Sequence, residues 1–391
     1  MREIYADHAG TTAPASEVIA AMQPYLGASF GNPSSVHRRG EAARDAIQAA
    51  RADVAALIGA TPEEIVFTAT GSEANNLALQ GVMHAERRER DSKRRRLVVS
   101  AIEHPSVLET ARELESEGFG LTILPVGRDG IVSLHDAAQA IRSDVALVSL
   151  MMVNNETGVM QPVRELAELA HAAGARFHTD AVQAVGKTTV DVGLLDADLL
   201  SLAGHKFHGP LGAAALYTRR RTRLQPMIHG GHQERTRRAG TENLPAIVGL
   251  GVAAKRANER LASESMRLAT LGDRLLHGLL TRLPQARLNG HRERRLKSIV
   301  NLCLPGIDGE ALLHELDLSG ITISTGSACS AASPGPSHVL VAMGLRPEEA
   351  HASVRFSLGE SNEAADIDRM IEAVPAAFER IRALATASRQ A

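Results

Sequence analysis

Short apolar runs alternate with helix-like stretches between residues 60 and 217, and this alternation leaves the chain few folds. Most of the runs are apolar on both faces, as parallel strands covered by helices are. The predicted strands are 64–68, 97–101, 121–126, 145–153, 176–180, 199–202 and 213–217. The predicted helices between them are 73–88, 105–117, 134–141 and 162–173. The pattern predicts an α/β fold around a mostly parallel sheet, with ligands at the carboxyl ends of the strands.

The rest of the chain predicts a smaller second unit. It contains a long helix, a strand, a helix, a strand and a last helix, at 246–282, 298–304, 309–318, 353–358 and 363–384. We expect a break or kink in the last helix at Pro375. A chain of 391 residues is long enough for two domains. We expect a large domain over 15–260 and a small α+β domain formed by 1–14 and 261–391.

Composition argues against several classes of function. A net charge of -2 and a sequence pI near 6.8 give no overall attraction to nucleic acid or anionic membranes. No apolar run is long enough to span a bilayer, and the N-terminus lacks the apolar core of a signal peptide. The arginine-rich stretch 86–96 is interleaved with acids, so we interpret it as a solvated helix end. The two cysteines, Cys303 and Cys329, indicate a cytoplasmic protein without a disulfide scaffold, and we expect no metal.

Lys206 and Asp180 each follow a predicted buried strand. Lys206 enters the glycine-lined loop 204–210, and loss of solvation lowers the pKa of a lysine amine and makes it a nucleophile toward aldehydes. A lysine that forms a Schiff base, with an aspartate for a pyridinium nitrogen, is what pyridoxal phosphate requires of a protein. Each residue alone has a simpler explanation, as a surface lysine or a helix-capping aspartate. Together they predict a pyridoxal phosphate site.

Other polar residues at strand ends could complete such a site. Gly71 and Ser72 open a predicted helix, where backbone amides and a hydroxyl could hold a phosphate, although a plain helix cap explains them equally well. His205 could add a further donor. His104 could stack on a pyridine ring and relay protons, whereas a lone histidine at a strand end is more often structural.

Two amides, an arginine and a cysteine are further candidates. Asn155 and Gln183 could each hydrogen-bond a ring oxygen or merely fix a loop. Arg355 could grip a substrate carboxylate with its planar fork, or form an ordinary ion pair. Cys329 lies in a run of small residues that looks exposed, which favours a reactive thiol over an incidental one. Cys303 has strand-like neighbours and looks buried and inert.

Ordered blocks along nearly the whole chain resemble the cysteine desulfurases of the NifS/IscS type, within the class V aminotransferase-like enzymes. The blocks are 5–12, 31–37, 103–105, 154–158, 180–183, 204–210, 230–234, 240–243 and 326–329. The resemblance implies the fold type I architecture of pyridoxal-phosphate-dependent aminotransferases, with a seven-stranded sheet in the large domain. It also implies conversion of L-cysteine to L-alanine.

The resemblance implies roles for residues around the cofactor ring. Lys206 would attach to the cofactor and remove the α-proton, and Asp180 would pair with the pyridine nitrogen. His104 would stack on the ring, while Asn155 and Gln183 would bond near its phenolic oxygen.

The resemblance also implies how the phosphate is held. Gly71, Ser72 and His205 would bind it within one subunit, and Thr241 would reach it from the neighbouring subunit of a homodimer. Ser72 stands where threonine is common and keeps the hydroxyl. Ala203 stands where serine or threonine is common, so one phosphate hydroxyl is absent.

In the implied reaction Arg355 binds the carboxylate of cysteine and Cys329 takes its sulfur as a persulfide. The required thiolate would come from a depressed pKa or from a base such as His104. An iron–sulfur scaffold protein is the default acceptor; tRNA thiolation or DNA sulfur modification would use the same site. The alternatives are a selenocysteine lyase, another enzyme on this scaffold such as an aminotransferase, and a non-catalytic protein that kept the fold.

Three further stretches bear on partners. Residues 7–10 read Asp-His-Ala-Gly, which departs from the common pattern and to which we assign no chemistry. Residues 330–338 resemble the long-loop group, whose cysteine can travel to an external acceptor. Residues 386–391 lack the tail that housekeeping members use toward their scaffold partner.

Overall fold

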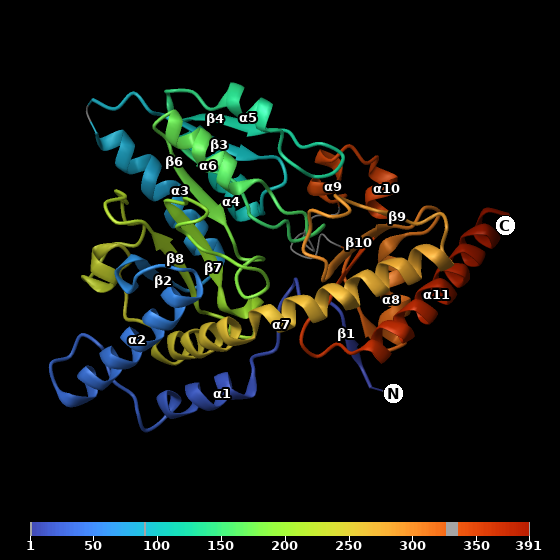
Figure 1. Ribbon diagram of the computed structural model, residues 1–391, viewed down its shortest axis with the longest axis horizontal. Coiled ribbons are helices and arrows are strands. Elements are labelled where there is room, and N and C mark those ends of the chain that lie inside the picture. The colour runs from blue at the N-terminus through green and yellow to red at the C-terminus, as the bar shows by residue number, and fades with distance from the viewer. Residues whose placement is uncertain (1, 90, 326–334, 391) are drawn as a thin grey trace.

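The computed structural model describes residues 2–89, 91–325 and 335–390, with side chains described up to residue 384. A seven-stranded sheet forms the centre of the larger part, with strand order β2-β8-β7-β6-β5-β3-β4 (Figure 1). The strands are β2 (Ile65–Thr68), β3 (Arg96–Ser100), β4 (Gly120–Leu124), β5 (Val145–Ser149), β6 (Arg176–Asp180), β7 (Leu199–Ala203) and β8 (Ala214–Thr218). β8 is antiparallel to both neighbours and the other pairings are parallel, which confirms the predicted sheet.

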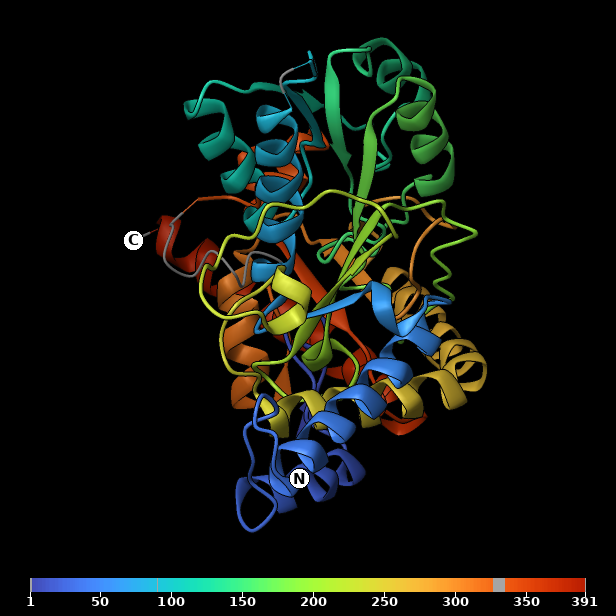
Figure 2. The same cartoon turned by 90° about the vertical axis from the view of Figure 1, so that its left-hand side faces the viewer.

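Helices cover both faces of this sheet (Figure 2). They are α1 (Ser16–Met22), α2 (Arg38–Leu57), α3 (Gly71–Arg88), α4 (Pro105–Ser116), α5 (Leu134–Ala140), α6 (Val163–Ala172) and the first part of α7 (Leu244–Arg282). Successive residues of β3 pack into different cores: Val98 joins α2, α5, α6 and α7, whereas Leu97 and Val99 join α3 and α4. Because both faces are buried, the strands read as continuous apolar runs.

The second half of α7 packs into a second, smaller core (Figure 1). A small separate cluster contains α9 (His338–Ala342) and α10 (Pro347–His351), which pack with Ile102. The helices of the second core are α8 (Gly309–Leu318), α11 (Ala364–Gln390) and part of α7. Its strands are β1 (Ile4–Tyr5), β9 (Arg287–Leu288), β10 (Ile299–Cys303), β11 (Ile321–Thr322) and β12 (Ser353–Ser357). β10 pairs antiparallel with β9 and β12, and β1 pairs parallel with β11. The domain boundary near residue 260 stays a prediction, because α7 runs through both cores.

The last helix is not broken at Pro375, one of the two outcomes we expected there. A proline in a helix removes a hydrogen bond and costs about 3 kcal/mol. However, α11 buries Met370, Val374 and Phe378 completely on either side of the proline. Each such side chain contributes about 1.5–3 kcal/mol on burial, so packing outweighs the local preference.

Within the described ranges, no helix is both long and apolar enough to cross a membrane.

Candidate active site

Nine of the eleven predicted site residues line one pocket of about 810 Å³ at the carboxyl ends of the parallel strands. They are Gly71, Ser72, His104, Asn155, Asp180, Gln183, His205, Lys206 and Arg355. Thr241 is not among the lining residues; it is exposed in the segment before α7. Cys329 lies outside the described residues. In the part of the chain that the structure describes, no group of three His, Cys, Asp or Glu could hold a metal ion.

Lys206 ends the helical turn Gly204–Lys206 that follows β7. Its Nζ donates to two backbone carbonyls, Ala9 O at 2.7 Å and Gly10 O at 2.6 Å. These carbonyls belong to the N-terminal segment, which crosses to the pocket from β1. A Cβ on Gly10 would lie 2.4 Å from a carboxylate oxygen of Asp7, so a larger residue here would displace the Asp7 side chain. The segment therefore holds two acceptors against the amine.

Asp180 ends β6 and accepts a hydrogen bond on each carboxylate oxygen. Oδ2 accepts from Asn75 Nδ2 at 2.7 Å, and Oδ1 accepts from the backbone amide of Val182 at 2.9 Å. Since both oxygens accept, the contacts stabilise the anionic carboxylate. Sequence reasoning missed Asn75, although it lies one helical turn after Gly71 and so on the same face of α3.

His104 is the N-cap of α4, and its Nδ1 accepts from the backbone amide of Ser106 at 3.1 Å. Burial, and then the positive charge of Lys206, lowers the pKa of His104, although the charge of Asp180 opposes this. The ring is therefore neutral at pH 7. Because Nδ1 is an acceptor, the single ring proton is on Nε2.

The start of α3 presents backbone amides to the pocket. Thr70 caps the helix by accepting from the amide of Glu73 at 3.0 Å, and the first-turn amides of Gly71 and Ser72 have no partner within the helix. A Cβ on Gly71 would lie 3.0 Å from Val182 Cγ2, so the backbone approaches the sheet closely here. Burial lowers the pKa of His205 to about 4, which leaves a neutral ring. These groups can hold an anion.

Arg355, on β12, is buried and already bonded within the protein. One Nη donates to Asp7 Oδ1 at 2.6 Å and the other to the backbone carbonyl of Asn155 at 2.9 Å. The ion pair joins the N-terminal segment to the smaller core. A substrate carboxylate at Arg355 would share the guanidinium group with Asp7, a residue to which the sequence analysis assigned no chemistry.

Gln183 is also held at both ends of its amide. Nε2 donates to Ala9 O at 2.8 Å, and Oε1 accepts from Lys187 Nζ at 2.7 Å. Lys187 was not identified from the sequence. Its spacing of four residues from Gln183 is the only local signal of the contact.

The described residues that flank Cys329 are fixed to this pocket. Ser324 exchanges two backbone hydrogen bonds with Arg355, at 2.7 and 3.1 Å. On the other side, Ser337 Oγ donates to a carboxylate oxygen of Glu156 at 2.5 Å. Burial raises the pKa of Glu156 to about 7. Both ends of the cysteine-bearing segment are thus tied beside residues of the pocket.

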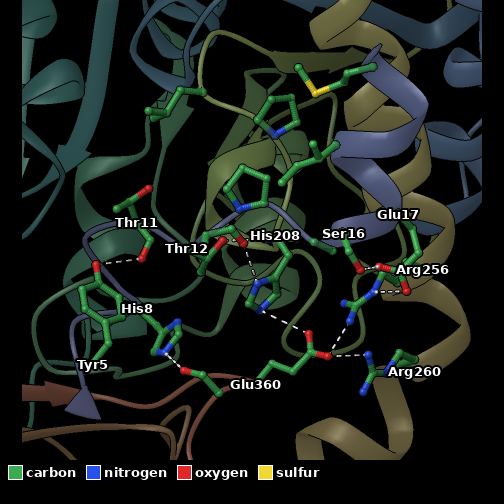
Figure 3. Close-up of a pocket in the computed structure, with 18 of the residues that line it drawn as sticks. Tyr5, His8, Thr11, Thr12, Ser16, Glu17, His208, Arg256, Arg260 and Glu360 are labelled. Atoms are coloured by element: carbon green, nitrogen blue, oxygen red, sulfur yellow. Dashed lines mark hydrogen bonds and ion pairs between the residues drawn. The ribbon is translucent and has the colours of Figure 1, made fainter. Parts of the chain in front are cut away.

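A larger cavity of about 1130 Å³ is lined by the N-terminal segment, α1 and α7 (Figure 3). At one end of this cavity the Glu360 carboxylate accepts from Arg256 and Arg260. Nε2 of His208 lies 3.7 Å from Oε2 of Glu360. The cavity contains neither Lys206 nor Asp180 among its lining residues. The predicted site residues that the structure brings together therefore lie in the smaller pocket.

Comparison with known proteins gives a consistent result. Residues 4–370 match the aminotransferase class-V family. A cysteine desulfurase IscS of Methanosarcina thermophila is 45% identical over 381 residues, which is 97% of this chain and 93% of the relative. A solved NifS-like protein superimposes with a TM-score of 0.89 at 33% identity, covering 96% of this chain and 99% of that one. The structure of SspA in complex with cysteine has a TM-score of 0.80 at 37% identity, covering 91% and 98%.

Proposed function

The chain belongs to the aminotransferase class-V family and is a cysteine desulfurase that depends on pyridoxal phosphate, and we propose here how its residues carry out the reaction. The substrate is L-cysteine and the product is L-alanine. The observation that carries the proposal is one pocket that combines Lys206, the anionic Asp180 and the free amides at the start of α3.

The donor set of the pocket fits the cofactor. The amides of Gly71 and Ser72 suit the phosphate, a carboxylate held anionic suits the ring nitrogen, and a lysine amine suits the aldehyde. Ala203, which replaces a family hydroxyl, only removes one further donor. When bound, this group withdraws electrons from the α-carbon of the substrate, which allows the α-proton to leave and the carbon–sulfur bond to break.

We assign the proton movements to two residues. Lys206 takes the α-proton of cysteine, and Asp180 keeps a proton on the ring nitrogen. Ala9 O and Gly10 O accept hydrogen bonds from Lys206, so they orient its amine and stabilise it once it is protonated.

The other pocket residues bind and orient. Gln183 and Asn155 would donate to the ring oxygen, and Arg355 would bind the substrate carboxylate. For His104 we propose a donor role in place of a base, because the proton of its neutral ring is on Nε2. A hydrogen bond from this N–H would stabilise a thiolate.

Cys329 would accept the sulfur. Its thiolate attacks the sulfur of the substrate, so a sulfur–sulfur bond forms as the carbon–sulfur bond breaks. The β-carbon is reduced to the methyl group of alanine, and the two sulfurs are oxidised to the persulfide. One cysteine and one thiol give one alanine and one persulfide, so no external oxidant or reductant is needed.

The test is Cys329→Ser, with Cys303→Ser as the matched control at the other cysteine. We expect Cys329→Ser to keep the cofactor's absorbance and to lose alanine formation by at least about 100-fold. Cys303→Ser, provided that it folds, should keep both the cofactor's absorbance and the rate of alanine formation. If Cys329→Ser forms alanine from L-cysteine at the wild-type rate, the persulfide role is wrong. Wild-type protein that turns over only selenocysteine would favour the selenocysteine lyase alternative.

We propose a homodimer in which Thr241 reaches the partner's phosphate. The preceding segment is pinned by Arg238, whose Nε lies 2.8 Å from Glu73 Oε1, so Thr241 is presented outward. Mixed dimers of Lys206→Ala and Thr241→Val chains test this, because one of their two sites would be intact. Random exchange makes half of the dimers mixed, so about a quarter of all sites are intact and about a quarter of the wild-type activity should return on mixing. No recovery would show that Thr241 does not act across the dimer.

We propose an iron–sulfur scaffold protein as the sulfur acceptor and the cytoplasm as the compartment, where free thiols persist. Affinity capture with and without L-cysteine tests the acceptor. A scaffold protein that is retained and receives sulfur supports the proposal, whereas transfer only to a tRNA-thiolation or DNA-modification protein contradicts it.

A further inference from the structure

Lys187 is an amine beside the active site that the reaction described above does not use. It lies in the turns that follow β6, is half-buried, and lines a small cavity of about 50 Å³ together with Lys206. Its Nζ donates to Gln183 Oε1 at 2.7 Å. Gln183 Nε2 donates in turn to Ala9 O, the carbonyl that also accepts from Lys206. A chain of hydrogen bonds therefore joins the two lysines.

The contact with Lys187 fixes which way the amide of Gln183 faces. A lysine ammonium has three donors and no acceptor, so the atom that it touches is the amide oxygen. The amide NH₂ group is then the end left for Ala9 O and for the pocket, which Gln183 also lines. A flipped amide would leave the ammonium facing NH₂ hydrogens and would place an oxygen against Ala9 O. Lys187 thus makes Gln183 a donor toward any ligand.

The surroundings of Lys187 are mostly basic. Burial, and then the positive charges of Lys206 and Arg355, lowers the pKa of Lys187 to about 7. Among the described residues no carboxylate forms an ion pair with it. The charge on Lys187 in turn lowers the pKa of His8, His205 and His208, two of which are labelled in Figure 3. The remaining charged side chains around the small cavity are Arg256, Arg260, Glu264 and Glu360.

We propose that Lys187 is a positioning residue for the desulfurase reaction: its ammonium orients the amide of Gln183 and, while charged, disfavours protonation of Lys206. The inference rests on the proposed role of Lys206 as the proton acceptor. Coulomb repulsion is mutual, so a positive charge on Lys187 disfavours a positive charge on Lys206 as much as the reverse. A base is more effective when it is unprotonated near the working pH.

Cofactor-free protein provides the test, because amine protonation can be measured there without turnover. Competitive acetylation of lysines at a series of pH values, read by peptide mass spectrometry, gives the protonation midpoint of Lys206. Lys187→Met removes the charge, and Lys187→Arg keeps it at every pH. We expect the midpoint of Lys206 to be lowest in Lys187→Arg and highest in Lys187→Met, about 1 pH unit apart, with wild type between them.

The link through Gln183 is tested by the affinity for pyridoxal phosphate. Lys187→Met should weaken binding about 5- to 10-fold in the wild-type background and leave it unchanged in a Gln183→Leu background. Equal midpoints of Lys206 in all three proteins, or an equal loss of affinity in both backgrounds, would overturn the inference. If Lys187→Met does not fold, Lys187→Arg decides alone: a midpoint that is not below the wild-type value overturns it. The protonation midpoint and the cofactor affinity are both measured without turnover. They therefore test the role of Lys187 separately from the proposed desulfurase activity.

Discussion

Asn75→Leu separates the role of Asp180 in binding the cofactor from its role in stability. Asn75 is buried and donates to Asp180 Oδ2 at 2.7 Å and to Ser106 Oγ at 2.9 Å. Leucine has a similar volume and no donor, so the substitution removes the hydrogen bonds without opening a large cavity. The substitution thus removes one of the two hydrogen bonds that hold the carboxylate, together with the bond to Ser106 Oγ.

The expected magnitude follows from that contact. A hydrogen bond to a charged group contributes about 1.5–3 kcal/mol, which corresponds to roughly a 10- to 100-fold weaker affinity for pyridoxal phosphate. The cost in folding stability should be smaller, because Asn75 Oδ1 has no hydrogen-bond partner among the described residues and leucine removes that unsatisfied atom. Because Asp180 Oδ2 loses this donor in the cofactor-free protein as well, we expect the free energy of unfolding to fall by about 1–2 kcal/mol.

Equilibrium dialysis with pyridoxal phosphate measures the affinity, and urea unfolding followed by circular dichroism measures the stability. Gln80→Leu is the matched control on α3, since the amide of Gln80 donates to Asn76 and is not bonded to Asp180. An affinity of Asn75→Leu within twofold of wild type would refute the argument that this contact holds Asp180 ready for the cofactor.

Two further predictions concern stability. Arg51 pairs with Glu234 at 2.7 Å, and the two side chains are only 4% and 2% exposed. Arg51→Met should lower the free energy of unfolding in urea by about 3–5 kcal/mol, because it leaves the buried Glu234 carboxylate without its partner. A loss below about 1 kcal/mol would contradict this. The pKa of Glu156 is 4.5 in the unfolded chain and about 7 in the folded protein. Between these pH values the folded protein keeps a proton that the unfolded chain has released, so Glu156 makes the free energy of unfolding fall as the pH rises from 4.5 to about 7. Glu156→Gln should flatten the dependence of the urea midpoint on pH, and an unchanged slope would contradict the assignment.

The fold and most of the pocket were predictable because their signals are local. Strand β6 has the predicted bounds, and its last four side chains are buried, as the sequence pattern before Asp180 predicted. The carboxyl ends of parallel strands meet at one edge of the sheet. A lysine that follows one strand and an aspartate that ends its neighbour therefore had to lie close together.

The contacts that refine the pocket were not predictable, because they join residues far apart in the chain. Asn75 and Asp180 are separated by 105 positions, and Asp7 and Arg355 by 348. The sequence suggested His104 as a base, but the position of its proton depends on the amide of Ser106, which only the folded geometry supplies. At Pro375 a local rule was outweighed by packing that the sequence pattern does not quantify.

The central claim is that Lys206 is the residue that binds pyridoxal phosphate covalently. Borohydride reduction of the cofactor-loaded protein, followed by peptide mass spectrometry, tests it most directly. The account predicts a pyridoxyl group on the peptide that contains Lys206 and its absence from that peptide in Lys206→Ala. A pyridoxyl group on another lysine, or on none in fully loaded protein, would contradict the account.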